Sequence, residues 1–215
     1  MEEILNYLIE NGKAWIISQR ELHRPQAKAL PSGIKKRFGP YFPSDLLELA
    51  RIRHVPRIEN PGFFATLEQI GQPIQFDFRR TAGITFFDTI LIAKTAKTPR
   101  GLDSLYFHEC VHIVQYHLLG IDNFIEQYVN GWGQNGFSYH NIPLEQTAYD
   151  LQRAFEANPQ QPFSVEAEVK RQMGFVKSGR PDNRIEKTRA FHSIELATAA
   201  SLDEAHIQRG SVTRK

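Results

Sequence analysis

Apolar residues recur at helical spacing between residues 102 and 120, and this is the strongest pattern in the chain. Asp103 or Ser104 can cap the start of such a helix, and Gly120 stands where it would end. The pattern therefore predicts a helix whose middle turns include residues 108–112. Its apolar positions are Leu102, Leu105, Tyr106, Val111, Val114, Leu118 and Leu119.

Short β-type runs precede this helix. Residues 84–87 and 90–93 are rich in β-branched and aromatic side chains, and they flank Asp88-Thr89. They predict a tight hairpin or one long bent strand. Residues 51–55 alternate apolar and polar positions and stop before Pro56, which predicts another strand.

The remaining pattern predicts mostly helices and loops. Residues 23–43 are rich in Pro, Gly, Lys and Arg, which favours a basic linker, and residues 131–136 favour a polar loop. Further helices are expected at residues 2–17, 44–50, 122–129, 143–156 and 183–208.

These elements indicate an α+β fold with one central domain. A length of 215 residues and a hydrophobic content of 41% suit a single globular domain with appendages. We place an N-terminal helix and basic linker at residues 1–43, the central domain at residues 44–160, and a helical or partly disordered appendage at residues 161–215.

Charge and cysteine content say little about partners. The net charge is +2, but residues 19–57 are basic and residues 103–160 are acidic. We assign no nucleic-acid partner to the basic stretch, and a solvated face explains the acidic one equally well.

One cysteine, Cys110, rules out an internal disulfide. With no signal peptide and no apolar run long enough to cross a bilayer, we expect a cytoplasmic protein without a membrane partner.

The polar positions of the central helix carry chemistry. His108-Glu109-Cys110-Val111-His112 places two imidazoles one turn apart on the same face, where both can bind one zinc ion. Glu109 is rotated by about 100° from His108, so it lies beside the ion and can take a proton from a zinc-bound water. A lone motif of this length arises by chance in roughly 2% of chains of this composition, but its position inside a helix favours a metal site.

A catalytic zinc site normally has three protein ligands. The metzincin extension requires Gly at 115 and His at 118, and this chain has Gln115 and Leu118. Glu145, which follows His112 by 33 residues at the start of a predicted helix, is the preferred third ligand. His140 and Glu126 remain alternatives.

Residues 84–154 resemble an uncharacterised bacterial family of short gluzincin-type proteins. The resemblance rests on His108-Glu109-x-x-His112-x-x-Gln115, on Tyr139, and on Pro143-Leu144-Glu145-x-x-Ala148. It implies a minimal zincin-like fold in which a small mixed sheet packs on the motif helix. It also implies zinc ligands at His108, His112 and Glu145, with Glu109 as the general base.

The function expected from these residues is zinc-dependent hydrolysis of a peptide or protein substrate. Tyr139 or His140 is expected to stabilise the tetrahedral intermediate, although Tyr139 would also suit a packing role. Gln115 lies one turn after His112, where it can orient a ligand or hold Glu145. The alternatives are a zincin scaffold used as a binding or regulatory module, with a structural or lost metal, and a zinc hydrolase of non-peptide amides.

Overall fold

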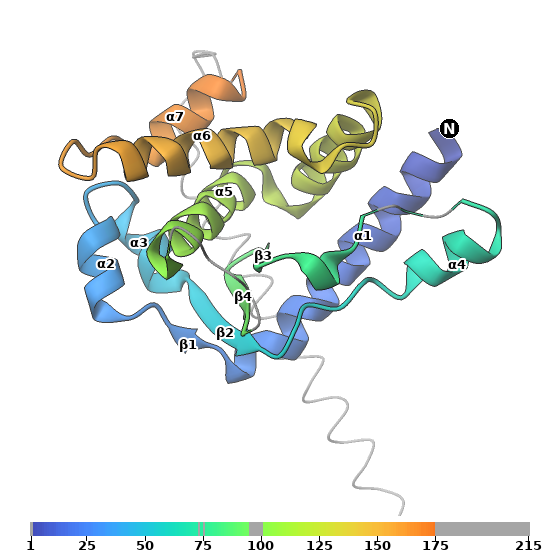
Figure 1. Cartoon of the computed structure of the whole chain (residues 1–215), viewed down its shortest axis with the longest axis horizontal. Helices are drawn as coiled ribbons and strands as arrows, with labels where there is room; N and C mark the ends of the chain where they lie inside the picture. The colour runs from blue at the N-terminus through green and yellow to red at the C-terminus, as the bar shows by residue number, and fades with distance from the viewer. Residues whose placement is uncertain (1, 73, 75, 95–100, 175–215) are drawn as a thin grey trace, which may run out of the picture. The chain divides into compact units, whose positions relative to one another are not determined.

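The motif helix is α5 (Leu102–Gln134), which lies beside a small sheet in the computed structural model (Figure 1). The structure describes residues 2–72, 74, 76–94 and 101–174. Across those residues the fold is mixed α and β, with seven α-helices and four strands, so the expected α+β class is confirmed. The other α-helices are α1 (Glu2–His23), α2 (Ser32–Phe38), α3 (Ser44–Leu49), α4 (Phe63–Gln69), α6 (Pro143–Ala157) and α7 (Val165–Gln172).

The four strands form one mixed sheet in the order β1-β2-β4-β3. β2 and β4 run parallel, whereas the two outer pairs are antiparallel. The predicted hairpin is confirmed, and Phe87 takes a positive φ of 63° in its turn. The strands are β1 (Lys28–Ala29), β2 (Arg51–Val55), β3 (Gly83–Phe86) and β4 (Thr89–Ala93).

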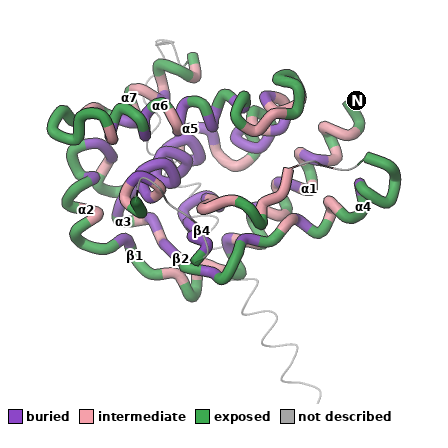
Figure 2. The backbone as a smooth tube through the Cα atoms, viewed as in Figure 1, coloured by how far each residue is buried: buried purple, intermediate pink, exposed green. Residues whose placement is uncertain are grey.

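The hydrophobic core lies between this sheet and α5. Every residue of β4 is buried, and Ile90 and Ile92 join Phe107 and Val111 of α5 in one cluster. Figure 2 shows the middle of α5 and β4 as continuously buried. Phe107 also stacks on Phe155 of α6, with ring centroids 4.4 Å apart. The motif helix is therefore held between the sheet and α6.

The predicted N-terminal helix is confirmed as α1, but the linker predicted at residues 23–43 is wrong, because these residues contribute to the core. Phe38, Tyr41 and Phe42 are buried in the central cluster, and residues 32–38 form α2 rather than a loop. Aromatic packing outweighs the loop-like composition there. All of the described residues fall within one compact unit.

Two glycines of α5 shape its path. Gly120 has φ 74° and ψ 169°, which breaks the helix where we predicted its end. The helix then resumes and continues to Gln134, so the first part of the loop predicted at 131–136 is wrong. Gly131 permits a close approach of α6, because a Cβ atom there would lie 2.7 Å from Cδ of Pro143.

The boundary predicted between residues 160 and 161 does not separate compact units either. α7 packs on the core through Val165 and Val169, both fully buried. The helix predicted at residues 183–208 lies outside the described residues. Among the helices that are described, none combines the length and apolarity that a bilayer crossing requires.

A buried ion pair anchors the β3–β4 turn to α1. Nε and Nη2 of Arg20 each donate to a carboxylate oxygen of Asp88 over 2.9 Å. Both side chains are almost completely buried, and Arg24 approaches the same carboxylate at 3.4 Å. This bidentate pair holds the hairpin turn against α1.

Asp88→Ala should lower the free energy of unfolding by about 3–5 kcal/mol, because it leaves the Arg20 guanidinium buried without its carboxylate. Urea denaturation followed by circular dichroism measures the change. Asp122→Ala is the matched control, since Asp122 pairs with Lys13 on the surface and its loss should change stability little. Equal stabilities of the Asp88 variant and the parent would contradict the anchoring role.

Candidate metal centre

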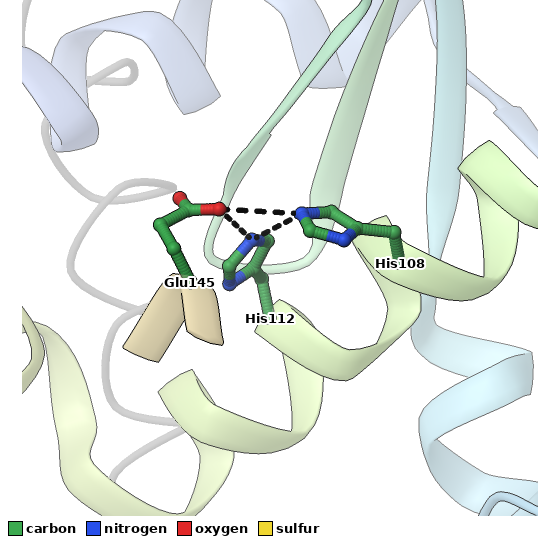
Figure 3. A group of neighbouring side chains, drawn as sticks. All are labelled: His108, His112 and Glu145. Atoms are coloured by element: carbon green, nitrogen blue, oxygen red, sulfur yellow. Dashed lines mark hydrogen bonds and ion pairs between the residues drawn. The ribbon is translucent and has the colours of Figure 1, made fainter. Parts of the chain in front are cut away.

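Three buried side chains bring their ligand atoms together above the middle of α5. Nε2 of His108 lies 3.2 Å from Nε2 of His112, and Oε2 of Glu145 lies 3.3 Å and 3.6 Å from these two nitrogens (Figure 3). All three residues are buried, and the group could hold a metal ion. Glu145 comes from α6 and both histidines come from α5.

Two of the buried polar atoms of this group have no hydrogen-bond partner among the described residues. They are Nδ1 of His108 and Oε2 of Glu145. A buried carboxylate oxygen without a donor is costly unless a positive charge faces it. Oε2 is the oxygen that points toward both imidazoles (Figure 3), so a cation bound there would satisfy it.

Gln115 orients His112 and links the two helices. Its Oε1 lies 2.8 Å from Nδ1 of His112, and its Nε2 donates to the carbonyl oxygen of Leu144 over 2.9 Å. Because an amide oxygen only accepts, Nδ1 of His112 carries a hydrogen, and Nε2 is the nitrogen that can bind a metal ion. The orienting role expected for Gln115 is therefore supported, and Leu144 precedes Glu145 directly.

Tyr128 holds the other oxygen of Glu145. Its hydroxyl donates to Oε1 over 2.9 Å, so Oε2 alone faces the histidines. Tyr128 lies on the part of α5 that follows the break at Gly120. The sequence pattern of residues 122–129 predicts a helix there but does not show which polar group Tyr128 contacts.

Glu109 lies beside the cluster rather than in it. The Thr85 hydroxyl lies 2.7 Å from Oε2 of Glu109 and 3.1 Å from its carbonyl oxygen. Gly83 on the same strand leaves the space that the carboxylate occupies, since a Cβ atom there would lie 2.5 Å from Oε1. Burial raises the pKa of Glu109 above its usual range, against the opposing influence of His108 and His112.

The charges of the cluster are strongly coupled. Burial alone would raise the pKa of Glu145, but the two imidazoles hold it well below its usual range. Burial alone would lower the pKa of His112, but Glu145 and Glu109 raise it. The metal-free centre therefore favours a carboxylate facing an imidazolium, and a metal ion would displace that proton when it binds.

Of the other predicted site residues, Tyr139 lies near the metal-ligand group, whereas His140 and Glu126 do not belong to it. Tyr139 and Glu145 line the same cavity, and the Tyr139 ring stacks on Phe76 with centroids 4.8 Å apart. Burial and the Glu145 carboxylate keep the pKa of its hydroxyl well above the usual value, so it stays a proton donor. His140 and Glu126 are exposed and lie outside the metal-ligand group of the described residues.

Comparisons of the chain with protein-family models, with curated proteins and with solved structures found no match. The site is therefore interpreted from its own geometry.

Glu145→Ala should weaken metal binding by about 10–100-fold or more, as His112→Ala should, because each removes one of three converging ligand atoms. Calorimetric titration with Zn²⁺ as the probe ion measures the affinity. Glu126→Ala and His140→Ala are the controls, since both residues are exposed and outside the group. Unchanged affinity in the Glu145 variant together with a loss in the His140 variant would move the third ligand to the loop.

Tyr128→Phe should weaken Zn²⁺ binding by about 10-fold, because Glu145 loses the donor that fixes its orientation. With Co²⁺ as a second probe, the visible absorption spectrum should change as Oε1 becomes free to approach the ion. Tyr106→Phe is the matched control, since that hydroxyl contacts Nε2 of His54 instead. Identical affinities and Co²⁺ spectra in the Tyr128 variant and the parent would exclude a positioning role.

Proposed function

We propose that the protein is a zinc-dependent metallopeptidase with a minimal zincin-like fold. The observation that carries the proposal is the convergence of His108, His112 and Glu145, with the carboxylate of Glu109 one residue after the first histidine. Two imidazoles and one carboxylate form a common ligand set of catalytic zinc. A base held next to the ligands has no use in a purely structural site.

The distances within the group suit zinc. Ligand atoms about 2.0–2.1 Å from a tetrahedral ion lie about 3.3–3.4 Å from one another. The three separations in the structure, 3.2, 3.3 and 3.6 Å, bracket that value. A donor set of two nitrogens and one oxygen also favours zinc over calcium or magnesium, which bind through oxygen.

The roles of the chain's own residues follow from their positions. Zinc, when bound, polarises the scissile carbonyl and makes a water acidic enough to attack it near neutral pH. Glu109 accepts the proton of that water and delivers it to the leaving amine. Thr85 keeps the Glu109 carboxylate beside the ligands. Tyr139, whose hydroxyl stays protonated, donates to the developing oxyanion.

The sheet edge supports a peptide as substrate. β3 is the edge strand next to Glu109, and no strand of the described residues pairs with its outer side. An extended peptide can add to such an edge through backbone hydrogen bonds. A non-peptide amide would not use this edge, and a binding module would not require Glu109.

Glu109→Gln should retain near-stoichiometric zinc and the fold but lose hydrolysis by several orders of magnitude, because the amide cannot accept the proton. Zinc content by atomic emission and cleavage of an unbiased peptide library by mass spectrometry test both parts. Glu126→Gln, an exposed substitution on the same helix, is the control. A zinc-loaded parent protein that cleaves nothing, or a variant as active as the parent, would refute the proposed function.

A further inference from the structure

The metal centre forms one side of a cavity of about 80 Å³. Glu109, His112 and Glu145 line that side. The opposite walls come from α1, the segment before β3, β3 itself and the second part of α5. Their main side chains are Trp15, Phe76, Phe78, Ile84, Phe86 and Ile125.

A second cavity of about 90 Å³ adjoins the first. The two share Trp15, Phe76, Phe78 and Ile125 among their lining residues. Apart from the hydroxyls of two tyrosines and the indole N–H groups of two tryptophans, the side chains that line the second cavity are apolar. The second cavity is not lined by Glu109, His112 or Glu145, so the apolar space extends from the first cavity away from the metal centre.

Contacts between aromatic rings fix the walls. Trp15 packs against Phe78 and Phe86, with ring centroids 5.0 Å apart in both pairs. Phe76 stacks on Tyr139, which ties the segment before β3 to the 3-10 turn (Tyr139–Asn141) that precedes α6. Edge-to-face and stacked pairs of this kind hold their geometry. The cavity is consequently built by four separate elements rather than left by one mobile side chain.

The charges around the first cavity exclude a charged occupant. Its charged lining residues are Glu109, His112 and Glu145, and all three are already engaged in the proposed chemistry. A charged substrate side chain placed among the aromatic walls would lose its water without gaining a partner. An apolar side chain would instead bury its surface at no electrostatic cost.

We propose that this cavity is the subsite for a large apolar side chain, aromatic or branched aliphatic, on the substrate residue adjoining the cleaved bond. The inference rests on the proposed function, because it takes His108, His112 and Glu145 as the ligands that position that bond. It adds the substrate class. The protein cleaves next to residues such as Phe or Leu and rejects Asp, Glu, Lys and Arg at the same position.

Binding of hydroxamic acids to the zinc-loaded full chain tests this without any turnover. The probes are acetohydroxamic acid, 3-phenylpropanohydroxamic acid and succinic monohydroxamic acid, titrated by calorimetry. The phenyl compound should bind about 10–100-fold more tightly than the acetyl compound, because its ring enters the cavity. The acid-ended compound should show no such gain.

A variant that fills the cavity tests whether the phenyl ring binds there. Ile84 lies half-buried on β3 and lines the cavity, so Ile84→Trp should abolish most of the phenyl advantage while leaving acetohydroxamate affinity unchanged. Ile70→Trp is the matched control, since Ile70 is 65% exposed and lines neither cavity. The series on the unaltered protein decides the matter even if the Ile84 variant does not fold.

The outcomes separate the two proposals. Equal affinities for the acetyl and phenyl compounds, or an advantage that survives in Ile84→Trp, would overturn the subsite while leaving the zinc centre intact. Failure of the protein to bind zinc, or of every hydroxamate to bind the zinc-loaded chain, would overturn the proposed function itself. A phenyl advantage in the unaltered protein supports the inference, and its loss in Ile84→Trp places the ring in this cavity.

Discussion

The Gln115 side chain joins the two helices that carry the metal-ligand group. It accepts from Nδ1 of His112 on α5 and donates to the Leu144 carbonyl at the start of α6. Gln115 is fully buried, so both hydrogen bonds form in a low-dielectric environment where losing either would be costly. One amide therefore sets both the direction of an imidazole and the separation at which Glu145 meets it.

Three other features bring the remaining groups to the site that Gln115 links. The break at Gly120 separates the motif turns of α5 from the turns that carry Tyr128, and both parts contact Glu145. Gly131 then lets Pro143 approach closely at the beginning of α6. The hairpin on the other side, anchored by Asp88, presents Thr85 to the base. Ligands and base are thus supported from opposite sides of one helix.

Local chemistry was readable from the sequence, and long-range packing was not. His108 and His112 are four residues apart, so the sequence alone places them on one face of a helix. Glu145 could be predicted as the third ligand because chain length limits where the returning helix α6 can begin. Tyr128 was missed because its partner lies on another element. Residues 23–43 were misjudged because Phe38 and its neighbours are buried by aromatic residues far along the chain, which composition does not show.

Gly83 has a consequence for recognising related chains. The short histidine motif occurs by chance too often to identify a site by itself, whereas a position that must lack a side chain imposes an independent condition. A Cβ atom there would lie 2.5 Å from Oε1 of Glu109, so the carboxylate would have to leave this pose. A search pattern that requires Gly-x-Thr 24–26 residues before that glutamate, and Gln six residues after it, would therefore select chains able to hold a base in this pose. Chains with the histidines but a bulky residue at the glycine position would belong to a different geometry.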